Sequence, residues 1–136
     1  MYEKAFMLEI VTPRKVVFRG EATSFSAPGT LGGFQVLYNH APLLSTLEIG
    51  KLKVKDKQGD DSFYSTSGGF IEVKNNEVVV VVETAEPANE IDVERAKAAK
   101  QRAEERLRSK HEDIDLERAR FALLRSLNRL RVAGMA

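Results

Sequence analysis

Residues 90–96 read Glu90-Ile91-Asp92-Val93-Glu94-Arg95-Ala96, and this stretch separates two chemically different parts of the chain. Nine of the ten aromatic residues lie before it, and nine of the eleven arginines lie in it or after it. Asp92 and Arg95 are three residues apart, so a helix would place their side chains on one face. We therefore expect a β-rich part to end here and a helical part to begin.

The sequence before this stretch repeats short runs in which apolar and polar residues alternate. Phe6, Leu8 and Ile10 belong to one such run, and residues 51–55 alternate lysines with apolar residues. A period of two is typical of strands with one buried face. The pattern predicts several such strands before Pro87.

The valine run 78–82 is long enough for a strand that is buried on both faces. Asn75-Asn76 and residues 57–60 have the composition of hairpin loops. Strands at a spacing of roughly ten residues, with no helical period between them, favour an antiparallel sandwich or flattened barrel. We assign this all-β sandwich to residues 1–87.

After Pro87 the apolar residues follow the period of an α-helix. Asn89 is the expected N-cap, with Asp92 in the first turn, where an acid complements the helix dipole. Two apolar stripes follow: Ala96, Ala99, Ala103 and Leu107, then Leu116, Ala119, Leu123, Leu127 and Leu130. The polar segment 109–113 separates them, which predicts an antiparallel two-helix hairpin over residues 88–136.

The first stripe is mostly alanine, so the hairpin buries little apolar surface. At ~25 cal/mol per Å² of apolar surface, it would be marginal alone. We expect a mobile hairpin that the sandwich, a ligand or another protein holds in place.

Composition bounds the class of protein. The chain has 136 residues, 43% of them hydrophobic, which is enough for a packed core. There is no cysteine, which excludes disulfides, thiolate catalysis and cysteine zinc sites. No secretory signal pattern and no run of ~18–20 apolar residues is present, so we expect a soluble intracellular protein.

Charge is uneven along the chain. The net charge is only +1, but residues 90–136 carry twelve basic and nine acidic side chains. From Arg118 to the end there are five arginines and no acid or lysine. A basic C-terminal helix suits an acidic partner or a polyanion.

Several segments in this order resemble the epsilon subunit of bacterial F-type ATP synthase. They are Gly33–Leu37, His40–Leu44, Gly68-Gly69-Phe70, the valine run, Ala85-Glu86 and Ile91-Asp92-x-x-Arg95-Ala96, followed by the two-helix tail. The resemblance spans essentially the whole chain. Tyr38-Asn39 departs from it, because a proline is common there in the family.

The resemblance implies a non-catalytic subunit of the central stalk of the rotor. In that family the sandwich docks on the gamma subunit and the c-ring. The tail lies folded against the sandwich, or extends along gamma towards the catalytic alpha and beta subunits and inhibits ATP hydrolysis. Such a subunit is peripheral to the cytoplasmic face of the cell membrane and reaches it only through the complex.

The arginines of the tail allow two interpretations from spacing alone. Arg95 and Arg102 share a face with Asp92, and Arg118, Arg125 and Arg129 share a face on the second helix. They form either a solvated charged surface or a fork of guanidinium groups for a polyanion.

The resemblance favours the fork, because some family members bind ATP in the folded tail without hydrolysing it. The matching residues are Glu86, Ile91, Asp92, Arg95, Ala96, Arg102, Arg125 and Arg129. Ile91 and the region of Asp92 would receive adenine, the arginines would neutralise the phosphates, and Glu86 would fix local geometry. Whether Mg²⁺ accompanies ATP stays open.

Two other functions are alternatives for this sequence. A nucleic-acid-binding module could use the arginine-rich helix, but that helix lacks interleaved aromatic residues and carries a leucine stripe. An all-β enzyme with a helical appendage lacks a catalytic set, because no serine, acid pair or metal-ligand partner is evident near His40. His111 is the other histidine of the chain, and two histidines alone do not make a metal site. We expect His40 to lie in an interface loop and Gly68-Gly69 to form a tight turn, since the Walker spacing is absent.

Overall fold

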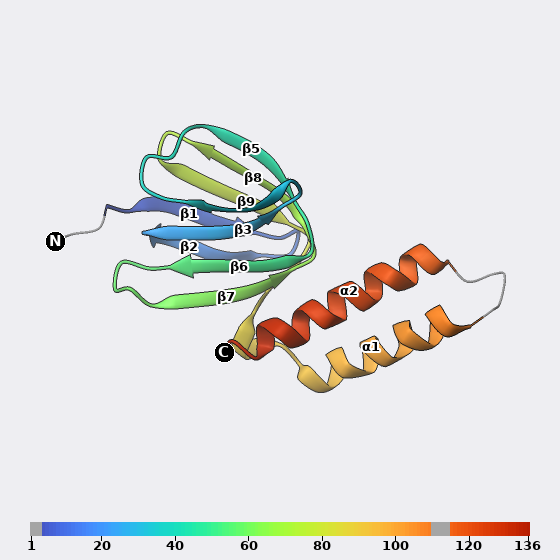
Figure 1. The fold of residues 1–136 in the computed structure, drawn as a ribbon. Coiled ribbons are helices and arrows are strands. Elements are labelled where there is room, and N and C mark those ends of the chain that lie inside the picture. Colours follow the sequence, from blue (N-terminus) through green and yellow to red (C-terminus); the bar gives the residue numbers. More distant parts are fainter. Residues whose placement is uncertain (1–3, 110–114) are drawn as a thin grey trace.

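The computed structural model describes residues 4–109 and 115–136, in which a β-rich part precedes two α-helices (Figure 1). The strands are β1 Phe6–Val11, β2 Val16–Ala22, β3 Ser24–Gly29, β4 Gly32–Val36, β5 Leu43–Leu47, β6 Gly50–Lys55, β7 Asp61–Thr66, β8 Gly69–Lys74, β9 Glu77–Val82 and β10 Ala85–Pro87. The helices are the 3-10 helix η1 Ala88–Glu90, α1 Val93–Arg108 and α2 Leu116–Ala133. The predicted order, a β-sandwich followed by a helical hairpin, is confirmed.

The strands wrap around one core in the order β10-β7-β6-β3-β5-β8-β9-β1-β2, with β4 paired to β3. Figure 1 shows the two α-helices at one end of these strands rather than over a face. The prediction of an antiparallel arrangement is wrong for one pair, since β1 and β9 run parallel. Pairing of strands this far apart in sequence has no local signature, because either direction satisfies the same alternation.

Alternating burial is observed as the sequence predicts in β1 and β6. Phe6, Leu8 and Ile10 are buried, and so are Leu52 and Val54 between lysines that are partly exposed. Each fully buried side chain of this size stabilises the fold by about 1.5–3 kcal/mol. The core of the sandwich therefore rests on the inward residues of each strand.

The valine run departs from its prediction. Val78, Val80 and Val82 are buried, whereas Val79 and Val81 are 38% and 44% exposed. Strand β9 pairs with β8 and β1, and only its inward face contacts the core. The prediction that this strand is buried on both faces is therefore wrong. Valine in a strand does not by itself indicate burial, because β-branched residues also suit the outer face of a strand.

The hairpin loops and the glycine turn are observed where the sequence predicts them. Asn75 and Asn76 adopt φ of 53° and 59° between β8 and β9, a region that asparagine tolerates. Gly68 has φ of 113°, and a Cβ there would lie 2.8 Å from the Leu47 carbonyl oxygen. Only glycine fits this turn into β8 without strain.

Helix α1 begins later than predicted. Its N-cap is Asp92, whose Oδ1 accepts a hydrogen bond from the Arg95 backbone N–H at 3.1 Å. Asn89 lies instead in η1, and Ile91 is extended, which breaks the chain before α1. Asp115 caps α2 in the same way through the Arg118 N–H at 3.0 Å.

The two helices run antiparallel against each other (Figure 1). Ala96 and Ala103 are buried, and Ala99 and Leu107 are half-buried, which confirms the first stripe. In the second stripe Ala119 is buried and Leu123 and Leu130 are half-buried, but Leu116 and Leu127 are exposed. Residues 110–113 of the predicted loop, including His111, lie outside the described residues.

In the described part of the chain, neither helix combines the length and apolar character needed to cross a membrane.

Candidate functional site

A buried asparagine joins α2 to the sandwich. Asn128 is 7% exposed, and its Nδ2 donates to the Gly50 carbonyl oxygen at 2.7 Å and to Ser65 Oγ at 3.0 Å. Its Oδ1 accepts from Arg131 Nη2 at 2.9 Å. Both amide protons and the carbonyl are therefore satisfied, as a buried amide requires.

A small apolar cluster closes the base of the hairpin. Ala88, Ile91 and Val132 are buried together, with Phe63 and Ala133 packed against them. This cluster brings the segment before α1 and the end of α2 together beside Phe63 of β7. It ties both ends of the hairpin to one place.

An ion pair links the helix and β10. Arg129 Nε lies 2.8 Å from Glu86 Oε1, and Nη2 donates to Oε2 at 2.9 Å. Glu86 is opposite Ser65 in the β10–β7 ladder, so the pair lies beside the Asn128 contacts. One charge-assisted hydrogen bond from Nη2 and a close ion-pair contact of Nε therefore hold Arg129 against Glu86.

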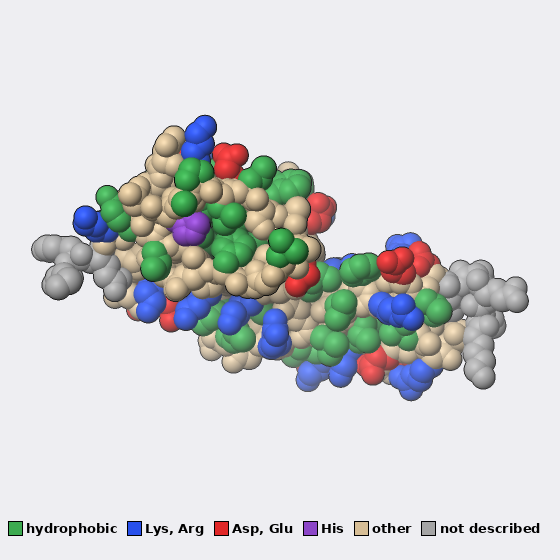
Figure 2. Space-filling model, turned by 45° about the horizontal axis from the view of Figure 1, so that its top comes forward, with side chains coloured by type: hydrophobic (Ala, Val, Ile, Leu, Met, Phe, Trp, Pro, Cys, Tyr) green, Lys and Arg blue, Asp and Glu red, His purple; other side chains and the backbone are tan. Residues whose placement is uncertain are grey.

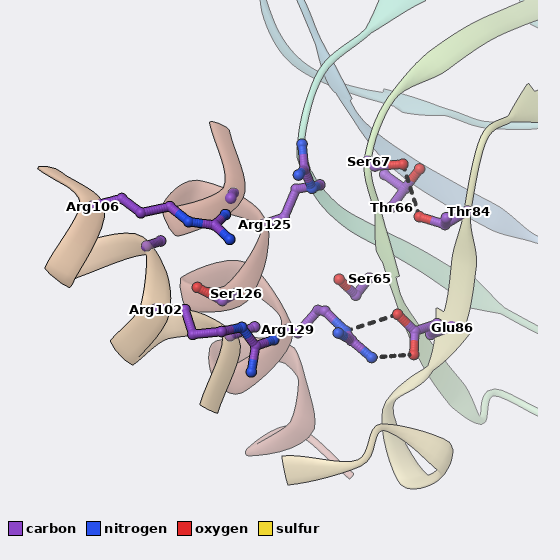
Figure 3. A pocket seen from close by; sticks show the side chains of 13 residues that line it. Ser65, Thr66, Ser67, Thr84, Glu86, Arg102, Arg106, Arg125, Ser126 and Arg129 are labelled. Carbon is purple, nitrogen blue, oxygen red and sulfur yellow. Dashed lines mark hydrogen bonds and ion pairs between the residues drawn. The ribbon is translucent and has the colours of Figure 1, made fainter. Parts of the chain in front are cut away.

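A cavity of about 330 Å³ lies between the hairpin and the sandwich, and we call it the hairpin cavity (Figure 3). Four arginines line it, two from each helix, together with hydroxyl groups from the sandwich. The lining polar residues are Arg102, Arg106, Arg125, Arg129, Glu86, Ser65, Thr66, Ser67, Thr84 and Ser126. Alanines of the two helices complete the wall.

The electrostatics of the hairpin cavity favour an anion. Glu86 is its one lining carboxylate and is paired with Arg129, which leaves three guanidinium groups without a lining acid. Figure 3 shows Arg102 and Arg106 coming from α1 and Arg125 and Arg129 from α2. Planar guanidinium donors beside hydroxyl groups are suited to the several oxygens of a polyphosphate chain. The volume falls in the range of small-molecule pockets.

The structure brings half of the predicted nucleotide residues into this cavity. Glu86, Arg102, Arg125 and Arg129 line it. The other four lie nearby but elsewhere: Ile91 in the apolar cluster, Asp92 at the helix cap, Ala96 buried in α1, and Arg95 in a neighbouring cleft.

This neighbouring cleft, of about 520 Å³, lies at the turn between β1 and β2, and we call it the turn cleft. Arg95 lines it together with Arg14 and Lys15 of that turn. Thr84, Glu86 and Arg129 line both the turn cleft and the hairpin cavity. The two spaces therefore meet at the Glu86–Arg129 pair.

Sequence reasoning missed two kinds of residue at this site. Arg106 follows Arg102 by four positions, so the helical spacing that selected Arg102 also selects it. Asn128 is a poor helix former in the middle of α2, and such a residue in a helix interior is a signal of a specific hydrogen bond. The hydroxyls of β7 carry no comparable signal, because serine and threonine are common in strands.

Of the two histidines singled out from the sequence, His40 lies among the described residues and His111 lies outside them. His40 Nδ1 lies 2.7 Å from the adjacent Ala41 carbonyl oxygen, between β4 and β5. Burial raises the pKa of Tyr64, and the charge of Glu90 raises it further, so its hydroxyl stays protonated near neutral pH. No group of three or more histidines, aspartates or glutamates is placed to hold a metal ion among residues 4–109 and 115–136.

Exposed apolar side chains of α2 lie beside the turn between β5 and β6. Phe121, Leu124 and Leu127 are 47%, 50% and 42% exposed and, with Ile49, line a groove of about 550 Å³. Figure 2 shows apolar side chains along the hairpin beside lysines and arginines. An apolar stripe flanked by charge is typical of a surface that contacts another protein.

Two models of protein families together match nearly the whole chain. The model of the beta-sandwich domain of the ATP synthase delta/epsilon chain matches residues 5–88, and that of its long alpha-helix domain matches residues 89–134. The ATP synthase epsilon chain of Desulforamulus reducens is 52% identical over 96% of this chain and 98% of its own length. That of Syntrophomonas wolfei is 47% identical over 98% of this chain and 97% of its own.

Solved structures share the fold. A chain of the Euglena gracilis mitochondrial ATP synthase, in a structure of OSCP, F1 and the c-ring, matches with a TM-score of 0.83 at 22% identity. It is covered to 82%, and this chain to 97%. A central-stalk and c-ring structure from Tetrahymena thermophila matches with a TM-score of 0.61 at 15% identity, covering 99% of this chain and 98% of the other.

Proposed function

The chain belongs to the ATP synthase delta/epsilon family, and from this we propose that it is a non-catalytic subunit of the central stalk of a bacterial F-type ATP synthase. Relatives named ATP synthase epsilon chain match it over nearly their full length. No residue of this chain is assigned a catalytic step. Its role is to couple the c-ring to the catalytic head and to regulate ATP hydrolysis.

The same family membership supports a proposal for the partners of this chain. Structures with this fold come from assemblies that contain the c-ring, which supports a place for the sandwich against the gamma subunit and the c-ring. The exposed apolar stripe of α2 supports a further protein contact for the hairpin. We place the protein at the cytoplasmic face of the cell membrane, held there by the complex.

The hairpin cavity carries the proposal of ATP binding. Its three guanidinium groups without a lining acid balance most of the charge of a triphosphate, and its volume suits a bound small molecule. ATP is bound as a regulatory ligand and is not hydrolysed.

The same arginines give the site its regulatory logic. In the folded hairpin Arg125 lines the hairpin cavity and Arg129 binds Glu86. An extended tail would break the Glu86 and Asn128 contacts and offer the acid-free basic run from Arg118 to Arg131 to the catalytic alpha and beta subunits, where it inhibits ATP hydrolysis. ATP shifts this balance by RT ln(1 + [L]/Kd), which is ~2.7 kcal/mol at a hundredfold excess over Kd.

Calorimetric titration of the chain with ATP tests the proposal. We expect a single site, and at least about tenfold weaker binding in the Arg102→Ala/Arg125→Ala variant, because two phosphate partners are removed. Titrations with and without Mg²⁺ decide whether the metal accompanies the nucleotide.

Arg118→Ala/Arg120→Ala is the matched control. Both residues are exposed on α2 and do not line the hairpin cavity, so the control loses the same charge without touching the site. Absence of heat at millimolar ATP in the unsubstituted chain would contradict ATP binding. Equal losses in the two variants would contradict the site.

A further inference from the structure

The hairpin cavity leaves one requirement of the proposed switch unmet. All of its basic residues come from the two helices, whereas the sandwich contributes hydroxyl groups and the Glu86 carboxylate. A polyphosphate there draws α1 and α2 together, but the only charge it meets on the sandwich is negative. A ligand stabilises the docked hairpin only if it binds that form more tightly than the undocked one. A positive charge on the sandwich would supply the difference.

The turn between β1 and β2 carries such charges. Arg14 and Lys15 line the turn cleft together with Arg95 of α1 and Arg129 of α2. Arg14, Lys15 and Arg95 make no salt bridge within residues 4–109 and 115–136, and Glu83 and Glu86 are the acids that line the cleft. With Glu86 paired to Arg129, three cations face one exposed carboxylate, that of Glu83.

The turn is held in a defined conformation. Thr12 N–H donates to the Lys15 carbonyl oxygen at 2.9 Å, and the backbone N–H groups of Arg14 and Lys15 donate to Thr12 Oγ1 at 3.3 Å each. The two basic side chains are therefore presented from a fixed backbone. Less backbone ordering is then needed when a ligand binds.

We propose that Arg14 and Lys15 bind the phosphate chain of the regulatory ligand and make its binding specific for the docked hairpin. The hairpin cavity and the turn cleft are adjacent, because Thr84, Glu86 and Arg129 line both, and a polyphosphate bound along Arg129 would lie between the cations of the two spaces. It then contacts cations of α1, of α2 and of the sandwich at once. This inference rests on the proposed binding of ATP and assigns the sandwich side of that site.

Calorimetry of Arg14→Ala/Lys15→Ala with ATP and with inorganic tripolyphosphate tests the assignment. We expect both titrants to bind about fivefold to tenfold more weakly, since charge-assisted hydrogen bonds at a partly exposed site are lost. Tighter binding of ATP than of tripolyphosphate identifies the nucleotide as the ligand, and the reverse order identifies free polyphosphate. A variant that keeps the unsubstituted affinity for either titrant overturns the assignment.

Lys4→Ala/Lys74→Ala is the control for net charge. Lys4 precedes β1 and Lys74 ends β8, at the opposite end of β1 from the turn, so the same charge is lost away from the cleft. We expect its affinity to stay within about twofold of the unsubstituted chain, because a distant surface charge is screened by salt. An equal loss in both variants would overturn the proposal.

Hydrogen exchange separates this inference from the proposed function. In the unsubstituted chain, saturating ATP should slow amide exchange in α2, and in Arg14→Ala/Lys15→Ala at matched saturation the slowing should shrink by at least about half. Equal slowing in both proteins overturns the role of the turn and leaves ATP binding intact. An unsubstituted chain that binds neither titrant contradicts both proposals.

Discussion

At the scale of single residues, Asn128 decides how the hairpin is attached. Its polar side chain is 7% exposed and donates hydrogen bonds to the carbonyl oxygen of Gly50 and the hydroxyl of Ser65. The arginine contacts at the same interface depend on charge, but the hydrogen bonds from Asn128 to Gly50 and Ser65 are between neutral groups. The docked position of α2 therefore has a component that salt does not screen.

Asn128→Ala should loosen the hairpin without unfolding the sandwich. The change leaves the Gly50 carbonyl and the Ser65 hydroxyl without their partner, which costs about 1–3 kcal/mol of docking free energy. Amide exchange in α2 should accelerate roughly fivefold or more, while exchange in β1 and β9 stays unchanged.

Ser126→Ala is the control for Asn128→Ala. Ser126 is equally buried, but its hydroxyl donates to the Leu123 carbonyl oxygen within α2. Exchange that accelerates as much in this control as in Asn128→Ala would show that any polar loss in α2 has the same effect.

The arginines of the site could be predicted from the sequence more readily than its neutral residues. Helical spacing places Arg102 with Asp92 and Arg95 on one face and Arg125 with Arg129 on another, and the family resemblance selects them for the site. The structure brings Arg102, Arg125 and Arg129 into one cavity. Asn128 and the hydroxyls of β7 act across the interface between the two parts of the chain. No periodicity within one element encodes such a contact.

At the scale of elements, the start of α1 is the feature that sequence and structure describe differently. Asn89 and Asp92 are both good capping residues, and the pattern alone does not choose between them. The structure places the cap at Asp92, because Ile91 is extended and buried beside Val132. A tertiary contact thus sets the helix boundary.

Asp92→Ala should therefore destabilise the first turn of α1 by about 1 kcal/mol, whereas Asp92→Asn keeps an acceptor oxygen and should have little effect. Exchange of the amides near Arg95 measures this. Asn89→Ala is the matched control and should leave that exchange unchanged. If Asn89→Ala were the more damaging variant, Asp92 would not be the cap.

Strand patterning shows the same limit. The alternation in β1 and β6 predicts their buried faces correctly, because each face contacts one environment. The sequence pattern wrongly predicts that the valine run is buried on both faces, and it does not predict the parallel pairing of β1 with β9. Both depend on which strands become neighbours, a property of the whole sheet.

At the scale of the whole molecule, two parts of different composition meet at a site that neither part contains alone. The order of sandwich and hairpin could be predicted from the change of period near residue 90. The closure between them could not, because it rests on side chains some 40 to 80 residues apart, such as Glu86 with Arg129 and Gly50 with Asn128. The proposed regulation by ATP depends on this closure.

The most direct test is a distance distribution between the sandwich and α2. Since the chain has no cysteine, Lys74→Cys/Arg120→Cys takes two spin labels at exposed positions. We predict a single docked distance at saturating ATP and a growing longer-distance population as ATP is withdrawn, with no response to ATP when Arg102→Ala/Arg125→Ala is added. A distribution that is the same with and without ATP would contradict the account.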